Sequence, residues 1–123
     1  MSDTTINWFE IPTSNVDNAK TFYETVLGVA LGEMPGPDGD AMRVFMGPDG
    51  PTGTLIQAAE GIQPGAVGTR LYLNCADIDA ALERVANAGG KVVTAKTPIG
   101  PYGFMASLED LDGNLVALHT STA

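Results

Sequence analysis

The chain contains the same pattern of structural signals twice, and this repeat constrains its fold more than any other feature. Two amphipathic helices are indicated, at about 15–27 and 77–88, each with apolar residues at helical spacing. Each begins at a capping residue, Asn15 or Asp77, and each is followed by glycine, which favours a helix end. The matching caps, core positions and ends are separated by about half of the 123-residue chain. The sequence therefore predicts two copies of one structural unit.

Short alternating segments, typical of strands, surround each predicted helix. One precedes each helix, at 6–11 and 70–75. Three more follow each helix, separated by turns rich in glycine, proline and aspartate. They are expected at about 29–33, 41–46 and 54–58 in the first half, and at about 91–94, 104–108 and 115–119 in the second. The order strand, helix, strand, strand, strand is thus used twice within a single domain, 1–123, in module one (about 5–60) and module two (about 69–120).

The charge of the chain limits which classes of binding partner are expected. Its formal net charge is -9, from 15 acidic and 6 basic residues. An acidic surface repels phosphate backbones and anionic lipids, so nucleic acid and membranes are not expected as partners. There is no apolar run near the roughly 18 residues that a membrane span needs, and the first residues lack the pattern of a signal peptide. With a single cysteine, Cys75, we expect a cytoplasmic protein.

Several short motifs resemble those of a known superfamily. In chain order they are Phe9-Glu-Ile-Pro12, Ala19-Lys-Thr-Phe-Tyr-Glu-Thr-Val-Leu-Gly28, Ala76-Asp-Ile-Asp-Ala-Ala81, Ala88-Gly-Gly-Lys91 and Asp110-Leu-Asp-Gly-Asn114. With these motifs the chain resembles the vicinal oxygen chelate (VOC) superfamily, which includes glyoxalase I, bleomycin-resistance proteins and extradiol dioxygenases. The resemblance covers nearly the whole chain, and the stretch 96–103 is similar to a glyoxalase-like bacterial subgroup.

The resemblance implies an α+β fold in which two tandem βαβββ modules form a curved mixed sheet, a cup, with the helices on its outer face. Members that carry out metal chemistry bind one divalent ion inside the cup through His, Gln or Glu side chains. The four positions implied for those ligands are Trp8, Gln57, Arg70 and Ala117. Only Gln57 among them offers a metal ligand, since indole, guanidinium and methyl groups have no lone pair to donate. We therefore predict a cup without a metal or another cofactor.

The other inward positions suggest a site for a small organic molecule. Alternation along the strands turns Trp8, Glu10, Arg70 and Tyr72 inward. The two aromatic residues would stack on a planar or cationic ligand, or would fill the interior. Arg70 would grip a ligand carboxylate or phosphate, or would pair with Glu10. The loop at 98–103, which is rich in glycine and proline, is expected to form a fixed turn or to cover the ligand. The residues predicted to bind ligand are Trp8, Glu10, Gln57, Arg70, Tyr72 and, from this loop, Tyr102.

Three functions remain open on the sequence alone. The first is a glyoxalase- or bleomycin-resistance-like protein that binds a small organic molecule without metal. The second is a metal-independent, or atypical metal-dependent, lyase or isomerase related to lactoylglutathione lyase. In that enzyme Glu10 or His119 would move a proton and Arg70 would stabilise an oxyanion, although no catalytic residue is assigned. The third is a structural homodimer whose cup is filled by its own side chains. A homodimer is expected because related proteins often pair.

Overall fold

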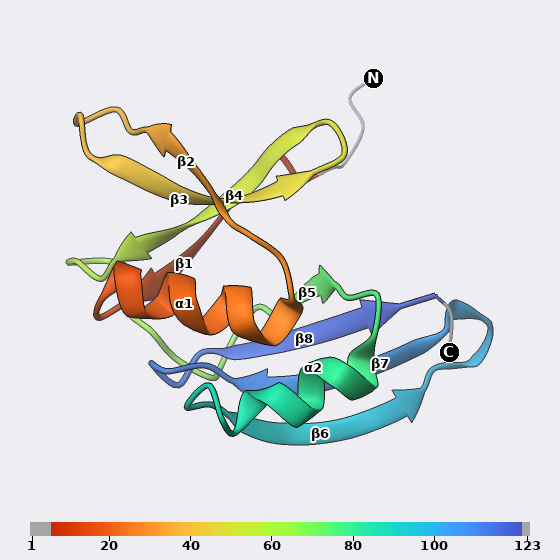
Figure 1. Cartoon of the computed structure of the whole chain (residues 1–123). Coiled ribbons are helices and arrows are strands. Elements are labelled where there is room, and N and C mark those ends of the chain that lie inside the picture. The colour runs from red at the N-terminus through yellow and green to blue at the C-terminus, as the bar shows by residue number, and fades with distance from the viewer. Residues whose placement is uncertain (1–5, 122–123) are drawn as a thin grey trace.

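The computed structural model describes residues 6–121, in which two α-helices and eight strands follow the predicted order (Figure 1). Module one consists of β1 (Phe9–Thr13), α1 (Val16–Leu27), β2 (Gly32–Pro35), β3 (Ala41–Gly47) and β4 (Gly50–Gln57). Module two consists of β5 (Leu71–Asn74), α2 (Ile78–Val85), β6 (Lys91–Pro98), β7 (Phe104–Glu109) and β8 (Leu115–Thr120), with a short 3-10 turn, η1 (Gly100–Tyr102), before β7.

Each module forms its own four-stranded mixed sheet. The strand orders are β1-β4-β3-β2 and β5-β8-β7-β6. In both sheets the first strand pairs in parallel with the last, and the remaining pairs are antiparallel. The α+β class and the tandem βαβββ modules are therefore confirmed. β1 and β5 are both edge strands, so the predicted mixed sheet is divided into two separate sheets. Figure 1 shows one sheet above the other with α1 between them.

The helix boundaries follow from local capping. The side chain of Asn15 accepts a hydrogen bond from the backbone of Asn18 at 3.0 Å, and α1 ends at Gly28, whose φ of 69° is left-handed. The side chain of Asp77 caps α2 in the same way. However, α2 ends earlier than predicted, because a turn around Gly89, with φ of 100°, replaces the last helical turn. Within residues 6–121, neither helix is long and apolar enough to cross a bilayer.

A single hydrophobic core extends through both modules. Both helices contribute fully buried residues to it, Phe22, Tyr23 and Val26 from α1 and Ile78 and Val85 from α2. α1 packs on β4 and on α2, while α2 packs on the sheet of module two. The core therefore fixes the position of one sheet relative to the other.

A buried polar network explains the aspartate-rich motif that precedes β8. The hydroxyl of Tyr23 donates to Asp110 Oδ2 at 2.7 Å, and Asn114 Nδ2 donates to the same oxygen at 2.9 Å. Asn114 Nδ2 also donates to the carbonyl of Pro12, and its Oδ1 accepts from the backbone of Gly65. The network thus ties the β7–β8 turn to α1, to β1 and to the link between modules. Burial and the Asp110 carboxylate raise the pKa of Tyr23 well above its ordinary value.

Candidate ligand-binding site

The six residues predicted to bind ligand do not converge on one place. Glu10 and Gln57 line a hollow in module one, whereas Tyr72 lines a separate crevice between the modules. The remaining three, Trp8, Arg70 and Tyr102, line neither, and Tyr102 is 72% exposed. The predicted residues therefore do not define a single site.

The register of module one corrects the orientation predicted for Gln57. Glu10 lies opposite Thr54 in the β1–β4 ladder, while Gln57 lies opposite Thr13. Gln57 is therefore on the face of Thr13 and not on that of Glu10, and its Nε2 donates to the carbonyl of Ser14 at 2.8 Å. A register shift in the β3–β4 ladder makes this hairpin differ from its counterpart in module two. The inward orientation predicted for Gln57 is thus wrong, and its role in binding stays a prediction.

The register of module two agrees with the predicted faces. Tyr72 lies opposite Ala117 and Asn74 opposite His119, so these four residues share one face of the sheet. Arg70 directly precedes this strand and is exposed. Among the residues that the structure describes, no ion pair joins it to Glu10. The alternative in which these two charges neutralise one another is therefore wrong.

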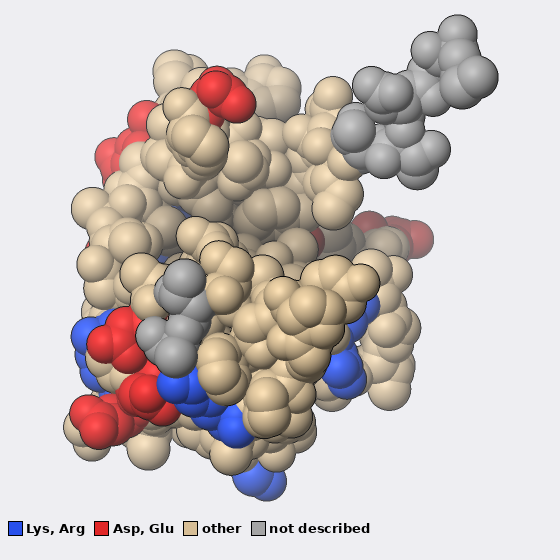
Figure 2. All heavy atoms as spheres, turned by 90° about the vertical axis from the view of Figure 1, so that its right-hand side faces the viewer, with Lys and Arg blue, Asp and Glu red and all other residues tan. Residues whose placement is uncertain are grey.

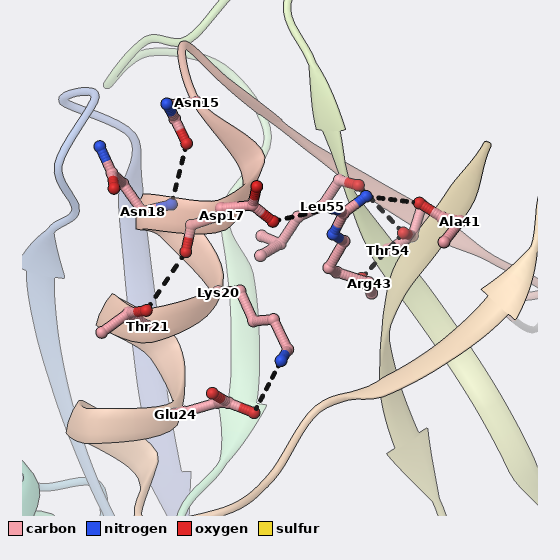
Figure 3. A network of polar contacts seen from close by, with 10 residues as sticks. All are labelled: Asn15, Asp17, Asn18, Lys20, Thr21, Glu24, Ala41, Arg43, Thr54 and Leu55. Carbon is pink, nitrogen blue, oxygen red and sulfur yellow. Dashed lines mark hydrogen bonds and ion pairs between the residues drawn. The ribbon is translucent and has the colours of Figure 1, made fainter.

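The hollow in module one has a volume of about 790 Å³ and an acidic margin. Glu10, Asp38 and Asp40 contribute carboxylates to its lining. Arg43 also lines it, but this side chain already has partners (Figure 3). Its Nη2 donates to Asp17 Oδ1 at 2.7 Å and its Nη1 to the carbonyl of Ala41 at 2.6 Å. Arg43 thus connects β3 to the first turn of α1 through its two Nη atoms, while its buried Nε has no hydrogen-bond partner among the described residues.

The crevice between the modules has a volume of about 560 Å³. The segment entering β1, the segment after α1, the β3–β4 hairpin and all of β5 line it. Apolar side chains make up most of the lining, and among them are the rings of Phe9, Phe45 and Tyr72 and the thioether of Met46. Of the described residues that line it, none is Asp, Glu, Lys, Arg or His. On the face drawn in Figure 2, uncharged side chains cover most of the region between the two sheets, and charged ones lie mainly toward the edges.

One wall of the crevice is an aromatic cluster with fixed geometry. The rings of Phe9 and Phe45 lie 5.3 Å apart, and Phe45 meets the edge of Tyr23 at 5.5 Å. Tyr23 is held in turn by its hydrogen bond to Asp110. Neither Phe9 nor Phe45 was among the residues predicted to bind ligand. Gly53 is the feature of the sequence that could have indicated this cluster. A glycine inside a strand often marks a place where another group lies close to the backbone, and here the Phe9 ring does so.

Comparison with known proteins settles the family. The family model of the Glyoxalase/Bleomycin resistance protein/Dioxygenase superfamily matches residues 5–118. The chain belongs to this superfamily. The resemblance inferred from the motifs of both modules is thereby confirmed, and the paired βαβββ modules agree with the VOC fold of related structures.

Three proteins illustrate what the chain is similar to. CFP32 of Mycobacterium bovis, which carries a glyoxylase description, is 29% identical over 119 residues, covering 93% of this chain but only 44% of that protein. TnmS3, an antibiotic binding protein from Streptomyces sp. CB03234, is 28% identical with a TM-score of 0.66 and 97% coverage of both chains. A glyoxalase/bleomycin resistance protein from Albidiferax ferrireducens is 20% identical, with a TM-score of 0.68 over 94% of this chain and 96% of that one, and supports the fold alone.

The positions implied for a VOC metal do not offer a suitable donor set. Gln57 donates its amide to Ser14, Ala117 is a buried methyl group, and Trp8 and Arg70 have no lone pair to give. Across residues 6–121, no group of three or more His, Cys, Asp and Glu side chains is arranged to hold a metal ion. A metal-free site stays a prediction.

Two other side chains that could be reactive, those of His119 and Cys75, are hydrogen-bonded or buried. His119 Nε2 lies 2.8 Å from the carbonyl oxygen of Tyr102 and so tethers the loop that contains η1. The Cys75 thiol is buried, and desolvation raises its pKa. Neither group lines the acidic hollow or the crevice.

Proposed function

We propose that this member of the VOC superfamily binds a small organic molecule in the crevice between its two modules. The observation that carries the proposal is the lining of the crevice, in which Phe9, Phe45 and Tyr72 supply rings while Asn7 and Asn74 supply polar groups. Ligand sites are typically concave, mostly apolar and about 300–1,000 Å³ in volume, a range that includes the 560 Å³ of the crevice. The antibiotic-binding description of TnmS3, a relative of similar length, also supports a binding role.

The crevice is a better candidate than the acidic hollow because its wall is already ordered. Tyr23 and Asp110 support the rings of Phe9 and Phe45 from behind, so little conformational entropy is lost when a ligand packs on them. The hollow in module one is instead lined by Arg43, whose Nη2 is engaged in an ion pair with Asp17 of α1.

A thermal-shift screen of metabolites and drugs tests this function. A compound that binds the folded state raises the melting temperature, and Tyr72→Ala should reduce the shift because Tyr72 lines the crevice and is 50% exposed. Tyr102→Ala is the matched control, since it removes another exposed tyrosine that lies outside the crevice. A library without any stabilising compound, or a shift that both variants reduce equally, contradicts the proposal.

We do not propose catalysis, because the groups suggested for it do not share a site. Glu10 lines the acidic hollow, whereas His119 is bonded to the backbone of Tyr102. A proton-transfer pair would have to lie within hydrogen-bond reach of one substrate. An open crevice also argues against a purely structural role with a filled interior.

We propose in addition that the protein forms a homodimer in the cytoplasm. β1 and β5 are edge strands, and such edges are usually covered by another segment or another chain. Tyr72, exposed on β5, would become partly buried in such a contact. Sedimentation over a range of concentrations should give the mass of two chains, and a monomer at every concentration contradicts this.

A further inference from the structure

The charge of the whole chain and the charge of the crevice differ. The formal net charge is -9, which by itself favours a cationic ligand. The carboxylates of Glu10, Asp38 and Asp40, however, lie around the hollow in module one. The described lining of the crevice contains neither an acidic nor a basic side chain. The net charge therefore does not report the chemistry of this site.

A ligand with a formal charge would find no counter-ion among the described residues that line the crevice. Burying a charge that is neither paired nor fully hydrogen-bonded is unfavourable, because the lost hydration is not replaced. The amides of Asn7 and Asn74 each offer a carbonyl acceptor and an NH₂ donor. They can satisfy hydroxyl or carbonyl groups of a ligand, but they do not neutralise an ion.

The rings set the shape of the ligand. Phe9 and Phe45 are tilted by 45° at 5.3 Å, so together they form an aromatic surface of fixed geometry. Tyr72 belongs to the other module and lines the same crevice. A flat aromatic molecule can pack against such rings in offset or edge-to-face contact.

We infer that the crevice selects an uncharged, flat aromatic molecule with hydroxyl or carbonyl substituents, and discriminates against its cationic and anionic analogues. The inference rests on the proposed function, since it names the class of molecule that the same crevice binds. Specificity is then determined by the lining of the crevice and not by the net charge of the chain.

Three probes with one ring system separate charge from shape: 1-pyrenemethanol, 1-pyrenemethylamine and 1-pyrenecarboxylate. Titration at pH 7, followed by pyrene fluorescence, should give the alcohol at least about tenfold tighter binding than either ion. An amine or carboxylate that binds as tightly as the alcohol overturns the inference while leaving the proposed function intact. Failure of all three probes, together with a library screen without a hit, overturns both.

A charge placed in the crevice should reverse the preference. Asn74→Asp replaces an amide by a carboxylate of nearly the same shape in the lining. We expect the affinity for 1-pyrenemethylamine relative to 1-pyrenemethanol to rise by about tenfold or more. Asn87→Asp is the matched control, because Asn87 is exposed and lies outside the crevice. Equal changes in the two variants would indicate long-range attraction and contradict the assigned site.

Discussion

The ring of Phe9 lies across the backbone of Gly53 in the neighbouring strand, so closely that a Cβ atom at position 53 would be 2.5 Å from its ring carbons. Gly53 is opposite Phe9 in the β1–β4 ladder and opposite Phe45 in the β3–β4 ladder. The missing side chain therefore lets rings from β1 and β3 meet over β4. This contact shapes the wall of the proposed site.

Gly53→Ala should displace the Phe9 ring. Overpacking of this kind costs about 1–3 kcal/mol in the free energy of unfolding, which urea denaturation measures. Ligands of the crevice should bind more weakly in the same variant, because the displaced ring alters the wall. Gly65→Ala is the control, since a Cβ there meets nothing within 4 Å. Equal stability of the two variants would show that the ring has room to move.

Tyr23→Phe removes the hydroxyl that donates to Asp110 at 2.7 Å inside the protein. Hydrogen bonds to charged groups contribute about 1.5–3 kcal/mol, so we expect a loss of that order in the free energy of unfolding. Chemical denaturation measures it, with Tyr102→Phe as the control because that side chain is exposed. Wild-type stability in Tyr23→Phe would mean that the bond to Asp110 contributes nothing.

The raised pKa values of Tyr23 and Cys75 predict a loss of stability in alkali. For both groups the pKa in the folded state lies above the unfolded value, so folding favours the neutral form. Their contribution is complete below the unfolded pKa values, about 8.5 for Cys and about 10 for Tyr, and is lost as the pH rises from there toward the folded values.

Thermal unfolding from pH 7 upward measures this loss. Tyr23→Phe should show a smaller decline than the wild type above about pH 10, because its phenol no longer titrates. Tyr102→Phe should decline as the wild type does. Parallel curves for the wild type and Tyr23→Phe would contradict the assignment to Tyr23.

The modules could be predicted from the sequence because their signals are local. Asn15 caps α1 and Gly28 ends it through contacts within a few residues, so spacing alone identifies them. The face of Gln57 could not be predicted, because it depends on which residue of β1 lies opposite each residue of β4. Alternation shows which residues of one strand share a face, but not how that strand is aligned with a partner far away in the chain.

The crevice could not be predicted for a different reason. Phe9 and Phe45 belong by alternation to the core side of their strands, and their second role depends on where the other module lies. That position is set by contacts between residues far apart in the chain, which no periodicity records. Tyr72, predicted from alternation alone, also lines the crevice, and its role in binding stays a prediction.

Arg84 is the clearest of these long-range contacts. From α2 its Nε and Nη2 both donate to the carbonyl of Val26, at 3.2 and 2.9 Å, and so satisfy a carbonyl in the last turn of α1. Arg84→Lys keeps the charge but loses the planar fork, and we expect a cost of about 1 kcal/mol in the free energy of unfolding. Arg84→Ala should cost more, because the side chain also packs beside Gly28.

Urea denaturation measures this order of stability, with Arg70→Ala as the control, since Arg70 is exposed and forms no ion pair with the described residues. Because Val29 to Leu31, which follow Val26, line the crevice, the Arg84 variants should also bind crevice ligands more weakly, whereas Arg70→Ala should not. An Arg84→Ala protein as stable as Arg70→Ala would show that the helices hold the modules together without this bond. If Arg84→Ala is less stable but binds ligands with unchanged affinity, the shape of the crevice does not depend on this contact between the helices.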